Sequence, residues 1–193
     1  MKQLNDIIGA ANRTLFLDRD GVINVRIPDD YVKNTAEFQF VDGALEALKM
    51  LSEYFAKIIV VTNQQGIGKG LITEKDVDIV HEHMISEIAR AGGRIDKVFV
   101  SPELKDSRSF TRKPAVGMGI AARKLFPEIK FRHSIMVGDT YSDMLFGYRL
   151  GMITVLISAD KKELIKSAEI TNFRFDSLLE FAQFYESKLQ KLK

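Results

Sequence analysis

Short apolar runs alternate along the chain with longer stretches in which apolar residues recur every three or four positions. The short runs have the length of buried strands, and the stretches between them predict amphipathic helices. The five clear strand candidates are residues 14–17, 58–62, 98–100, 135–137 and 153–157, and a weaker one is residues 173–175.

Several helix boundaries can be predicted from local signals. Thr73 is followed three residues later by Asp76, a pairing typical of a helix start, and Gly92 with Gly93 predicts the end of that helix. Pro114 is predicted to open another helix, and Asp176 to cap the last one. The apolar stripes are Ala44, Leu48, Leu51 and Phe55 in the first helix, Val77, Val80, Met84 and Ile88 in the second, and Leu178, Ala182, Tyr185 and Leu189 in the last.

Strands that alternate with helices predict an α/β fold: a Rossmann-like parallel sheet with helices on both faces. The length of 193 residues favours a single domain spanning 1–193. Such sheets bind ligands beyond the carboxyl ends of their strands. Polar residues stand at three of these ends, and residues 24–37, 64–71 and 101–112 form the most loop-like connections. The polar residues are Asp18 and Asp20, then Thr62 and Asn63, then Asp139.

Composition narrows the class of protein without identifying partners. Apolar residues make up 46% of the chain, and 28 basic against 26 acidic residues give a net charge of +2, typical of a globular protein. The absence of cysteine excludes disulfides and thiolate zinc sites. No basic stripe points to nucleic acid, no apolar run is long enough to span a bilayer, and residues 1–13 lack the apolar block of a secretion signal. We therefore expect a cytoplasmic protein.

Two pairs of carboxylates are the first candidates for chemistry. Asp18 and Asp20 lie two residues apart just after the first strand, where Gly21 supplies freedom for a turn. Asp139 and Asp143 lie one helical turn apart across a strand-to-helix junction. Clustered carboxylates require a cation or a proton between them, and oxygen ligands suit Mg²⁺. Taken singly, each pair is also compatible with a solvated loop or a helix cap.

Two further segments add a hydroxyl and a cation. Thr62 and the backbone N–H groups that follow it suit phosphate oxygens. Lys113 stands just before the helix start predicted at Pro114, where a cation opposes the helix dipole, so its charge is expected to serve another group. A polar turn and an ordinary surface lysine are the alternatives. The joint occurrence of all four segments, each where a strand should end, favours a site.

In these residues the sequence resembles the haloacid dehalogenase superfamily of phosphohydrolases, over roughly residues 13–157. Within it the chain looks most similar to the branch of histidinol phosphatases and heptose-bisphosphate phosphatases. The matching segments are Asp18 through Asn24, Tyr31-Val32, Thr62-Asn63-Gln64 with Gly66-Ile67, Arg112-Lys113-Pro114, Gly117-Met118, and Gly138-Asp139 with Asp143.

The resemblance implies roles for these residues. Asp18 would be the nucleophile that forms an aspartyl phosphate, Asp20 the general acid and base, and Lys113 the cation that orients Asp18. Thr62 would hold a phosphoryl oxygen. Mg²⁺ would be bound by the carboxylates of Asp18 and Asp139 and the backbone carbonyl of Asp20, with Asp143 in or beside its shell. Candidate substrate contacts are Asn63, Gln64, Arg112 and Tyr31.

The chain also departs from that branch. Its members often carry a zinc-binding loop of cysteines and histidines before the Arg-Lys-Pro motif, but residues 101–111 contain neither type, so no structural zinc is expected. About 20 residues separate Asp20 from the next helix, which leaves no room for a large cap domain.

The sequence therefore predicts a Mg²⁺-dependent phosphomonoesterase, most simply one acting on a small sugar phosphate such as D-glycero-D-manno-heptose 1,7-bisphosphate. Histidinol phosphate and a polynucleotide 3′-phosphate remain alternative substrates, and a catalytically inactive binding protein on the same fold remains the alternative of another class. We expect a monomer or a homodimer, with no contact to membranes and no preference for nucleic acid.

Overall fold

A computed structural model of the chain describes residues 13–191. Six parallel strands form one sheet in the order β3-β2-β1-β4-β5-β6. Their bounds are β1 Thr14–Leu17, β2 Lys57–Asn63, β3 Lys97–Ser101, β4 Ser134–Gly138, β5 Ile153–Ile157 and β6 Phe173–Phe175. All six predicted strands are present, including the weak one at β6. The predicted α/β class with a parallel sheet is confirmed.

The central strands are buried on both faces, which explains their continuous apolar sequences. All four residues of β1 and all five of β4 and β5 are buried. In register, Leu17 of β1 lies opposite Val60 of β2 on one side and Val137 of β4 on the other. β1 is therefore the middle of the sheet, and residues that follow it lie between the ends of β2 and β4.

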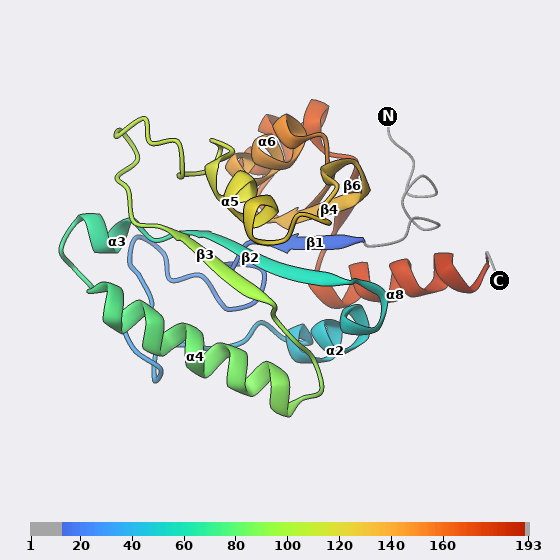
Figure 1. Ribbon diagram of the computed structural model, residues 1–193, viewed down its shortest axis with the longest axis horizontal. Coiled ribbons are helices and arrows are strands. Elements are labelled where there is room, and N and C mark those ends of the chain that lie inside the picture. Colours follow the sequence, from blue (N-terminus) through green and yellow to red (C-terminus); the bar gives the residue numbers. More distant parts are fainter. Residues whose placement is uncertain (1–12, 192–193) are drawn as a thin grey trace.

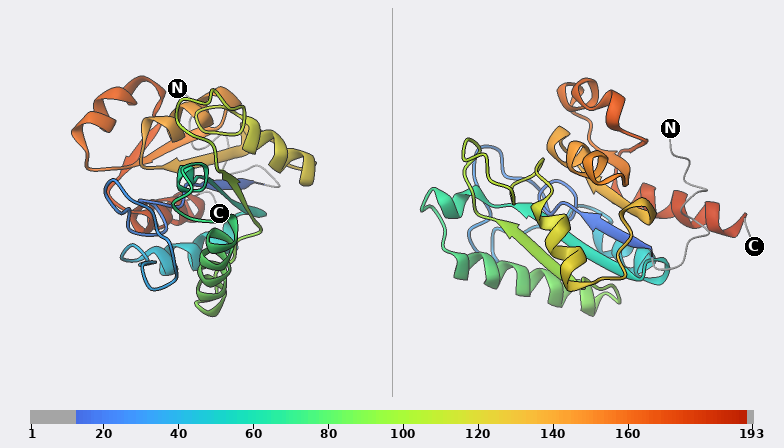
Figure 2. Two further views of the ribbon diagram at one scale, coloured as in Figure 1. Left: turned by 90° about the vertical axis from the view of Figure 1, so that its left-hand side faces the viewer. Right: turned by 45° about the horizontal axis from the view of Figure 1, so that its top comes forward.

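Helices cover both faces of the sheet (Figures 1 and 2). α2 (Ala44–Tyr54), α4 (Glu74–Arg90) and α8 (Leu178–Gln190) cover one face, and α5 (Gly117–Leu125) and α6 (Tyr141–Leu150) cover the other. The larger apolar core lies beneath the first group, where α2 packs against α8. The smaller core, which includes Phe16 and Phe146, lies beneath the second group. Short helices α3 (Gln65–Gly68), α7 (Lys161–Lys166), η1 (Phe131–His133) and η2 (Ala168–Ile170) complete the described chain.

The predicted start of α4 is confirmed. Thr73 accepts a hydrogen bond from the backbone N–H of Asp76, whose side chain in turn accepts from the backbone of Thr73. This reciprocal pair satisfies two backbone donors that the first helical turn leaves free. The helix ends at Arg90, ahead of Gly92 with its positive φ of 89°.

Two predicted helix starts are wrong. α8 is capped by Ser177, whose hydroxyl accepts from the backbone N–H of Glu180, and not by Asp176. α5 begins at Gly117 and not at Pro114. The backbone of Lys113 is instead bonded on both sides to the amide of Asn63, which holds these residues in a turn ahead of the helix. Residues 64–71, predicted as a loop, contain the single turn α3.

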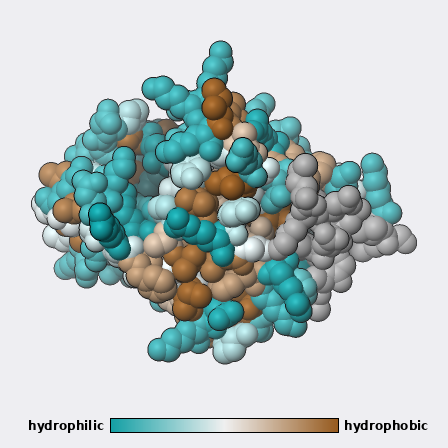
Figure 3. Space-filling view, turned by 90° about the horizontal axis from the view of Figure 1, so that it is seen from above, coloured by the Kyte–Doolittle hydropathy of each residue, from teal (hydrophilic) through white to brown (hydrophobic). Residues whose placement is uncertain are grey.

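The connection from β1 to α2 contains neither a helix nor a strand, and its β-pairing is limited to isolated bridges. Within residues 13–191, no helix is both long enough and apolar enough to cross a membrane. Figure 3 shows one face of the molecule as mostly hydrophilic, with smaller apolar patches between the polar side chains. The predictions for residues 1–12 lie outside the described residues.

Candidate active site

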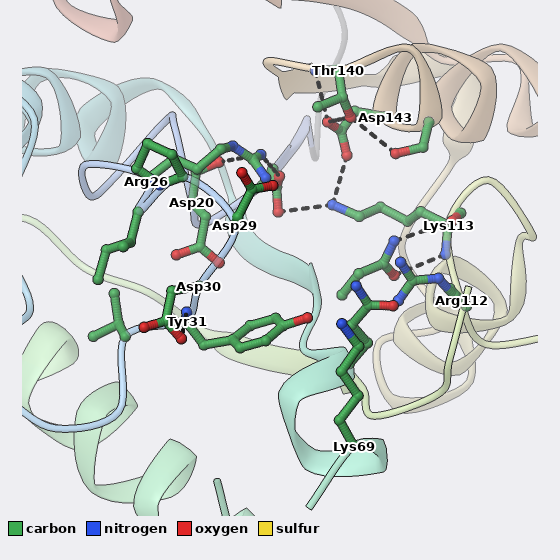
Figure 4. Close-up of a pocket in the computed structure, with 17 residues that line it drawn as sticks. Asp20, Arg26, Asp29, Asp30, Tyr31, Lys69, Arg112, Lys113, Thr140 and Asp143 are labelled. Carbon is green, nitrogen blue, oxygen red and sulfur yellow. Dashed lines mark hydrogen bonds and ion pairs between the residues drawn. The ribbon is translucent and has the colours of Figure 1, made fainter. Parts of the chain in front are cut away.

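The sequence-predicted polar residues meet at one edge of the sheet, at the carboxyl ends of β1, β2 and β4. Figure 4 shows Asp20, Lys113 and Asp143 around the cavity that lies there. Asp18 directly follows β1, Asn63 is the last residue of β2, and Asp139 follows β4. From β1 the chain runs outward through β2 to β3 and then returns to β4 on the other side. The site therefore lies where the strand order reverses, which is the usual ligand position in this class of sheet.

Three carboxylates form an acidic cluster. One oxygen from each of Asp18, Asp139 and Asp143 lies within 4.8 Å of the others, and Asp143 is fully buried. Gly21 allows the close approach of the β1 loop, because a Cβ there would lie 2.1 Å from Oδ2 of Asp139 and its φ is +90°. A buried donor set made only of oxygens fits Mg²⁺. The side chain of Asp20 is not part of this cluster.

Lys113 is the cation of the cluster. Its Nζ lies 2.8 Å from Oδ1 of Asp18 and 2.6 Å from Oδ1 of Asp143, and it donates to the backbone carbonyl of Val61 at 2.6 Å. Figure 4 shows its side chain extending across the site toward Asp143. The dipole argument that singled out Lys113 does not apply, since α5 starts four residues later, but its predicted proximity to carboxylates is confirmed.

Burial and mutual repulsion disfavour the charged forms of two of the carboxylates. Burial raises the pKa of Asp18 to about 6, although Lys113 opposes the shift. Burial and the nearby Asp18 raise the pKa of Asp139 to about 7. Burial alone lowers the pKa of Lys113, but Asp143 and Asp18 outweigh it and the net shift is upward. The cluster therefore favours a bound cation.

Asp20 is held as a carboxylate by three donors from outside the cluster. Arg19 donates to both of its oxygens, at 2.8 and 3.0 Å from Nη2, and Asn24 and Gln64 donate at 2.9 and 2.7 Å. Burial raises the pKa of Asp20, but the charge and hydrogen bond of Arg19, with those of the two amides, lower it below its usual value.

Arg19 and His81 are site residues that sequence reasoning missed. Arg19 is fully buried, and its Nη1 lies 3.1 Å from Nε2 of His81 on α4. Because a guanidinium only donates, Nε2 of His81 accepts this bond and the imidazole is neutral. Burial and the charge of Arg19 lower the pKa of His81 to about 3. One signal was present in the sequence: His81 falls on the apolar stripe of α4, between Val77 and Met84.

The four predicted substrate-contact residues are placed differently. Tyr31 and Arg112 line a cavity of about 500 Å³ that also borders Asp18 and Asp20, and Figure 4 shows the ring of Tyr31 directed toward Arg112. Asn63 lines the cavity too, but both ends of its amide bind the backbone of Lys113. Gln64 and the predicted phosphate ligand Thr62 are fully buried and bonded to each other at 2.9 Å. Neither residue lines the cavity. Gln64 instead donates a hydrogen bond to Asp20, so the pair helps to position that carboxylate.

A second cavity, of about 680 Å³, adjoins the first and is strongly basic. It shares Arg26, Arg112 and Lys113 with the first, and Glu163 is the acidic residue in its lining. The other cations come from segments far apart in the sequence, which is why no basic run is visible along the chain. They are Lys105, Arg108, Arg149 and Lys166.

Comparisons with known proteins agree with this geometry. The family model described as polynucleotide kinase 3 phosphatase matches residues 15–179. A relative from Mycobacterium bovis, named D-glycero-alpha-D-manno-heptose-1,7-bisphosphate 7-phosphatase, is 38% identical over 87% of this chain and 88% of its own length. One from Campylobacter jejuni with the same name is 33% identical over 91% of this chain and 97% of its own length.

A solved structure allows the folds themselves to be compared. The D,D-heptose 1.7-bisphosphate phosphatase from B. bronchiseptica, complexed with magnesium and phosphate, superposes with a TM-score of 0.83. It is 26% identical, and the match covers 91% of this chain and 99% of that one.

The sheet, its topological switch point and the acidic site with its buried lysine define a phosphatase of the haloacid dehalogenase superfamily. The chain belongs to the family of the polynucleotide kinase 3 phosphatase model and, within it, groups with the heptose-bisphosphate phosphatases.

Proposed function

We propose that this protein is a Mg²⁺-dependent phosphomonoesterase that removes the 7-phosphate of D-glycero-D-manno-heptose 1,7-bisphosphate through an aspartyl-phosphate intermediate. The observation that carries this proposal is the ion pair between Lys113 and Asp18 inside the acidic cluster, at the floor of a cavity of metabolite size. The names of the relatives supply the substrate.

Asp18 is the nucleophile in this mechanism. Its Oδ1 accepts from the backbone N–H of Arg19 at 2.7 Å and pairs with Nζ of Lys113, so the carboxylate is fixed in orientation. Lys113 also opposes the effect of burial on the pKa of Asp18, which favours the ionised, nucleophilic form. Attack on phosphorus forms the acyl phosphate and releases the sugar alkoxide.

Asp20 carries the protons. It gives a proton to the leaving alkoxide and then takes one from the water that hydrolyses the acyl phosphate. The lowered pKa of Asp20 suits the second step, in which a carboxylate acts as base. The first step needs the protonated form, and the like charge of a phosphate bound beside Asp20 would raise its pKa.

The acidic cluster is the proposed Mg²⁺ site. The carboxylates of Asp18 and Asp139 and the backbone carbonyl of Asp20 would hold the ion, with Asp143 beside them. The bound ion would screen the approach of an anionic nucleophile to an anionic ester. The oxygen-only donor set and the magnesium in the B. bronchiseptica structure support this assignment.

The basic second cavity supports a substrate with two phosphates. One phosphate would lie at Asp18, and the cations around Arg112 offer charge-assisted hydrogen bonds to the other. The same cavity could also hold the backbone of a phosphorylated strand end, which the description of the family model suggests. Histidinol phosphate carries one phosphate and offers no second phosphate to these cations. The cytoplasmic location and the monomeric or dimeric state stay predictions.

The test is release of inorganic phosphate with Mg²⁺ from both anomers of heptose 1,7-bisphosphate, histidinol phosphate and a 3′-phosphorylated oligonucleotide. We expect the heptose bisphosphate to lead, with the α anomer first. Asp18→Asn should abolish turnover, while Asp78→Asn on the exposed face of α4 is the matched control. Turnover by the Asp18→Asn protein contradicts the mechanism, and preference for the oligonucleotide contradicts the substrate.

A further inference from the structure

The guanidinium of Arg26 lies directly on the acidic cluster. Its Nη2 and Nε donate to the two oxygens of Asp139, at 2.7 and 3.0 Å. The same Nη2 donates to the backbone carbonyl of Asp20 at 2.8 Å and lies 3.7 Å from Oδ2 of Asp18. One cation thus reaches oxygen atoms of three residues.

These oxygens belong to the same three residues that the proposed function assigns to Mg²⁺. A metal ion and a guanidinium both need the lone pairs of Asp139 and of the Asp20 carbonyl, so the two cations compete for them. Asp143 has partners of its own, since Oδ1 pairs with Lys113 and Oδ2 accepts a hydrogen bond from Thr140. Binding of Mg²⁺ at these oxygens therefore requires Arg26 to leave.

The position of Arg26 allows it to leave. It lies on the connection from β1 to α2, and its side chain is 47% exposed, in contrast to the buried Lys113. Water reaches the guanidinium but much less of Asp139, which is 14% exposed, so the pair is partly screened and a divalent ion with twice the charge can replace the arginine. Arg26 also lines both cavities, as do Asn63, Lys113 and Arg112. A guanidinium released from Asp139 stays within the region where the substrate phosphate would bind.

We propose that Arg26 is an exchangeable counter-cation of the metal site. It neutralises the carboxylates until a divalent cation displaces it, and the displaced guanidinium then turns into the cavity and binds the anionic group of the ligand. This inference rests on the proposed metal site. It adds a residue that couples metal binding to phosphate binding.

Calorimetric titration of the chelator-treated full chain with Mg²⁺ tests the first half. Arg26→Gln removes the competing charge, so we expect the variant to bind Mg²⁺ more tightly, on the order of fivefold. Arg90→Gln, a 71% exposed arginine paired with Glu87 on α4, is the matched control and should bind like the wild type. Equal Mg²⁺ affinities of Arg26→Gln and wild type overturn the proposal.

Titration with inorganic phosphate at saturating Mg²⁺ tests the second half. Arg26→Gln should bind phosphate more weakly, on the order of tenfold, and Arg26→Lys should recover part of this loss. Unchanged phosphate affinity overturns the role in ligand binding. Both titrations are independent of turnover, so a wild type that hydrolyses no metabolite on the panel contradicts the proposed substrate while the titrations still decide the role of Arg26.

Discussion

At the scale of single residues, the two buried cations of the site, Lys113 and Arg19, each join two other side chains. Lys113 joins Asp18 to Asp143, and Arg19 joins Asp20 to His81. Taking an ion out of water costs several kcal/mol, which a close partner with good geometry offsets. Removing one member of such a group leaves the others unpaired, and the loss of function is then accompanied by a loss of stability.

Replacement of Lys113 tests this coupling. Lys113→Met should abolish phosphate release and lower the free energy of unfolding by about 3 kcal/mol, because Asp18 and Asp143 lose their shared cation. Urea unfolding followed by circular dichroism measures the second effect. Lys124→Met, on the exposed side of α5, should change neither quantity. A Lys113→Met protein as stable as the wild type would show that the ion pairs contribute no net stability.

His81 predicts a dependence of stability on pH. Its pKa is lowered from 6.5 to about 3 in the folded protein, so the unfolded chain binds its proton at higher pH than the folded chain. The contribution of His81 is fully present above pH 6.5 and is lost as the pH falls toward 3. At pH 5 the loss in the free energy of unfolding is about 2 kcal/mol, since each pH unit below 6.5 corresponds to about 1.4 kcal/mol.

Unfolding midpoints in urea between pH 7.5 and 4.5 measure this slope. His81→Gln keeps an acceptor for Arg19 without a titrating ring, so its stability should fall less steeply with pH than that of the wild type. His83→Gln makes the same change on the same helix without touching Arg19. Parallel slopes for wild type and His81→Gln would refute the assignment.

The residues that sequence analysis found and those it missed differ in how far along the sequence their partners lie. Asp18, Asp20 and Asp139 could be predicted because each follows a strand, so local patterning alone brings them to one edge. Arg19 pairs with its neighbour Asp20, but its second partner, His81, lies 62 residues away along the chain. Arg26 pairs with Asp139, which lies 113 residues away. The apolar stripe of α4 indicates that His81 is buried, but no local signal shows which residue it contacts, so the pairing itself follows only from the fold.

At the scale of elements, strands were more predictable than helix starts. Buried parallel strands carry continuous apolar runs, which are visible in the sequence. A helix start depends on which of two neighbouring polar side chains accepts a hydrogen bond from the backbone of the first helical turn. At α4 only Thr73 stands at the right distance from Asp76, and the prediction is confirmed. At α8 both Asp176 and Ser177 can cap, and the structure selects Ser177.

Alanine substitutions at these two positions test the cap of α8. Ser177→Ala should lower the free energy of unfolding by about 1 kcal/mol, because the backbone N–H of Glu180 loses its acceptor. Asp176→Ala should cost less than about 0.5 kcal/mol, as for an ordinary surface change. Thermal unfolding of both variants decides between the two caps. A larger effect at Asp176 would restore the assignment made from the sequence.

At the scale of the whole molecule, the site draws its parts from both halves of the sheet. The acidic cluster takes Asp18 from the end of β1, Asp139 from the loop after β4 and Asp143 from α6, while Lys113 precedes α5. The basic cavity likewise gathers cations from residue 26 to residue 166. Charge balance along the sequence could not predict this cavity, because its members become neighbours only when the sheet is complete.

A ligand that binds a site assembled from distant segments stabilises the folded state and not the unfolded state. The unfolded chain does not hold Asp18 near Asp139, 121 residues further on, so Mg²⁺ at the proposed site should add to the free energy of unfolding by mass action. At a hundredfold excess over its dissociation constant the gain is about 2.7 kcal/mol. For a chain of this size that corresponds to a rise in Tm of about 5–10 °C.

Thermal unfolding with Mg²⁺ and with excess chelator measures this rise. In Asp139→Asn the ion loses a carboxylate, and we expect most of the rise to disappear, whereas Asp78→Asn on the outer face of α4 should keep it. The effect is specific to the site only if it saturates with Mg²⁺ concentration and is not reproduced by Na⁺ at equal ionic strength, since screening of exposed charges does not saturate. A Tm that rises equally in wild type and Asp139→Asn would place the ion elsewhere and remove the support for a metal at the acidic cluster.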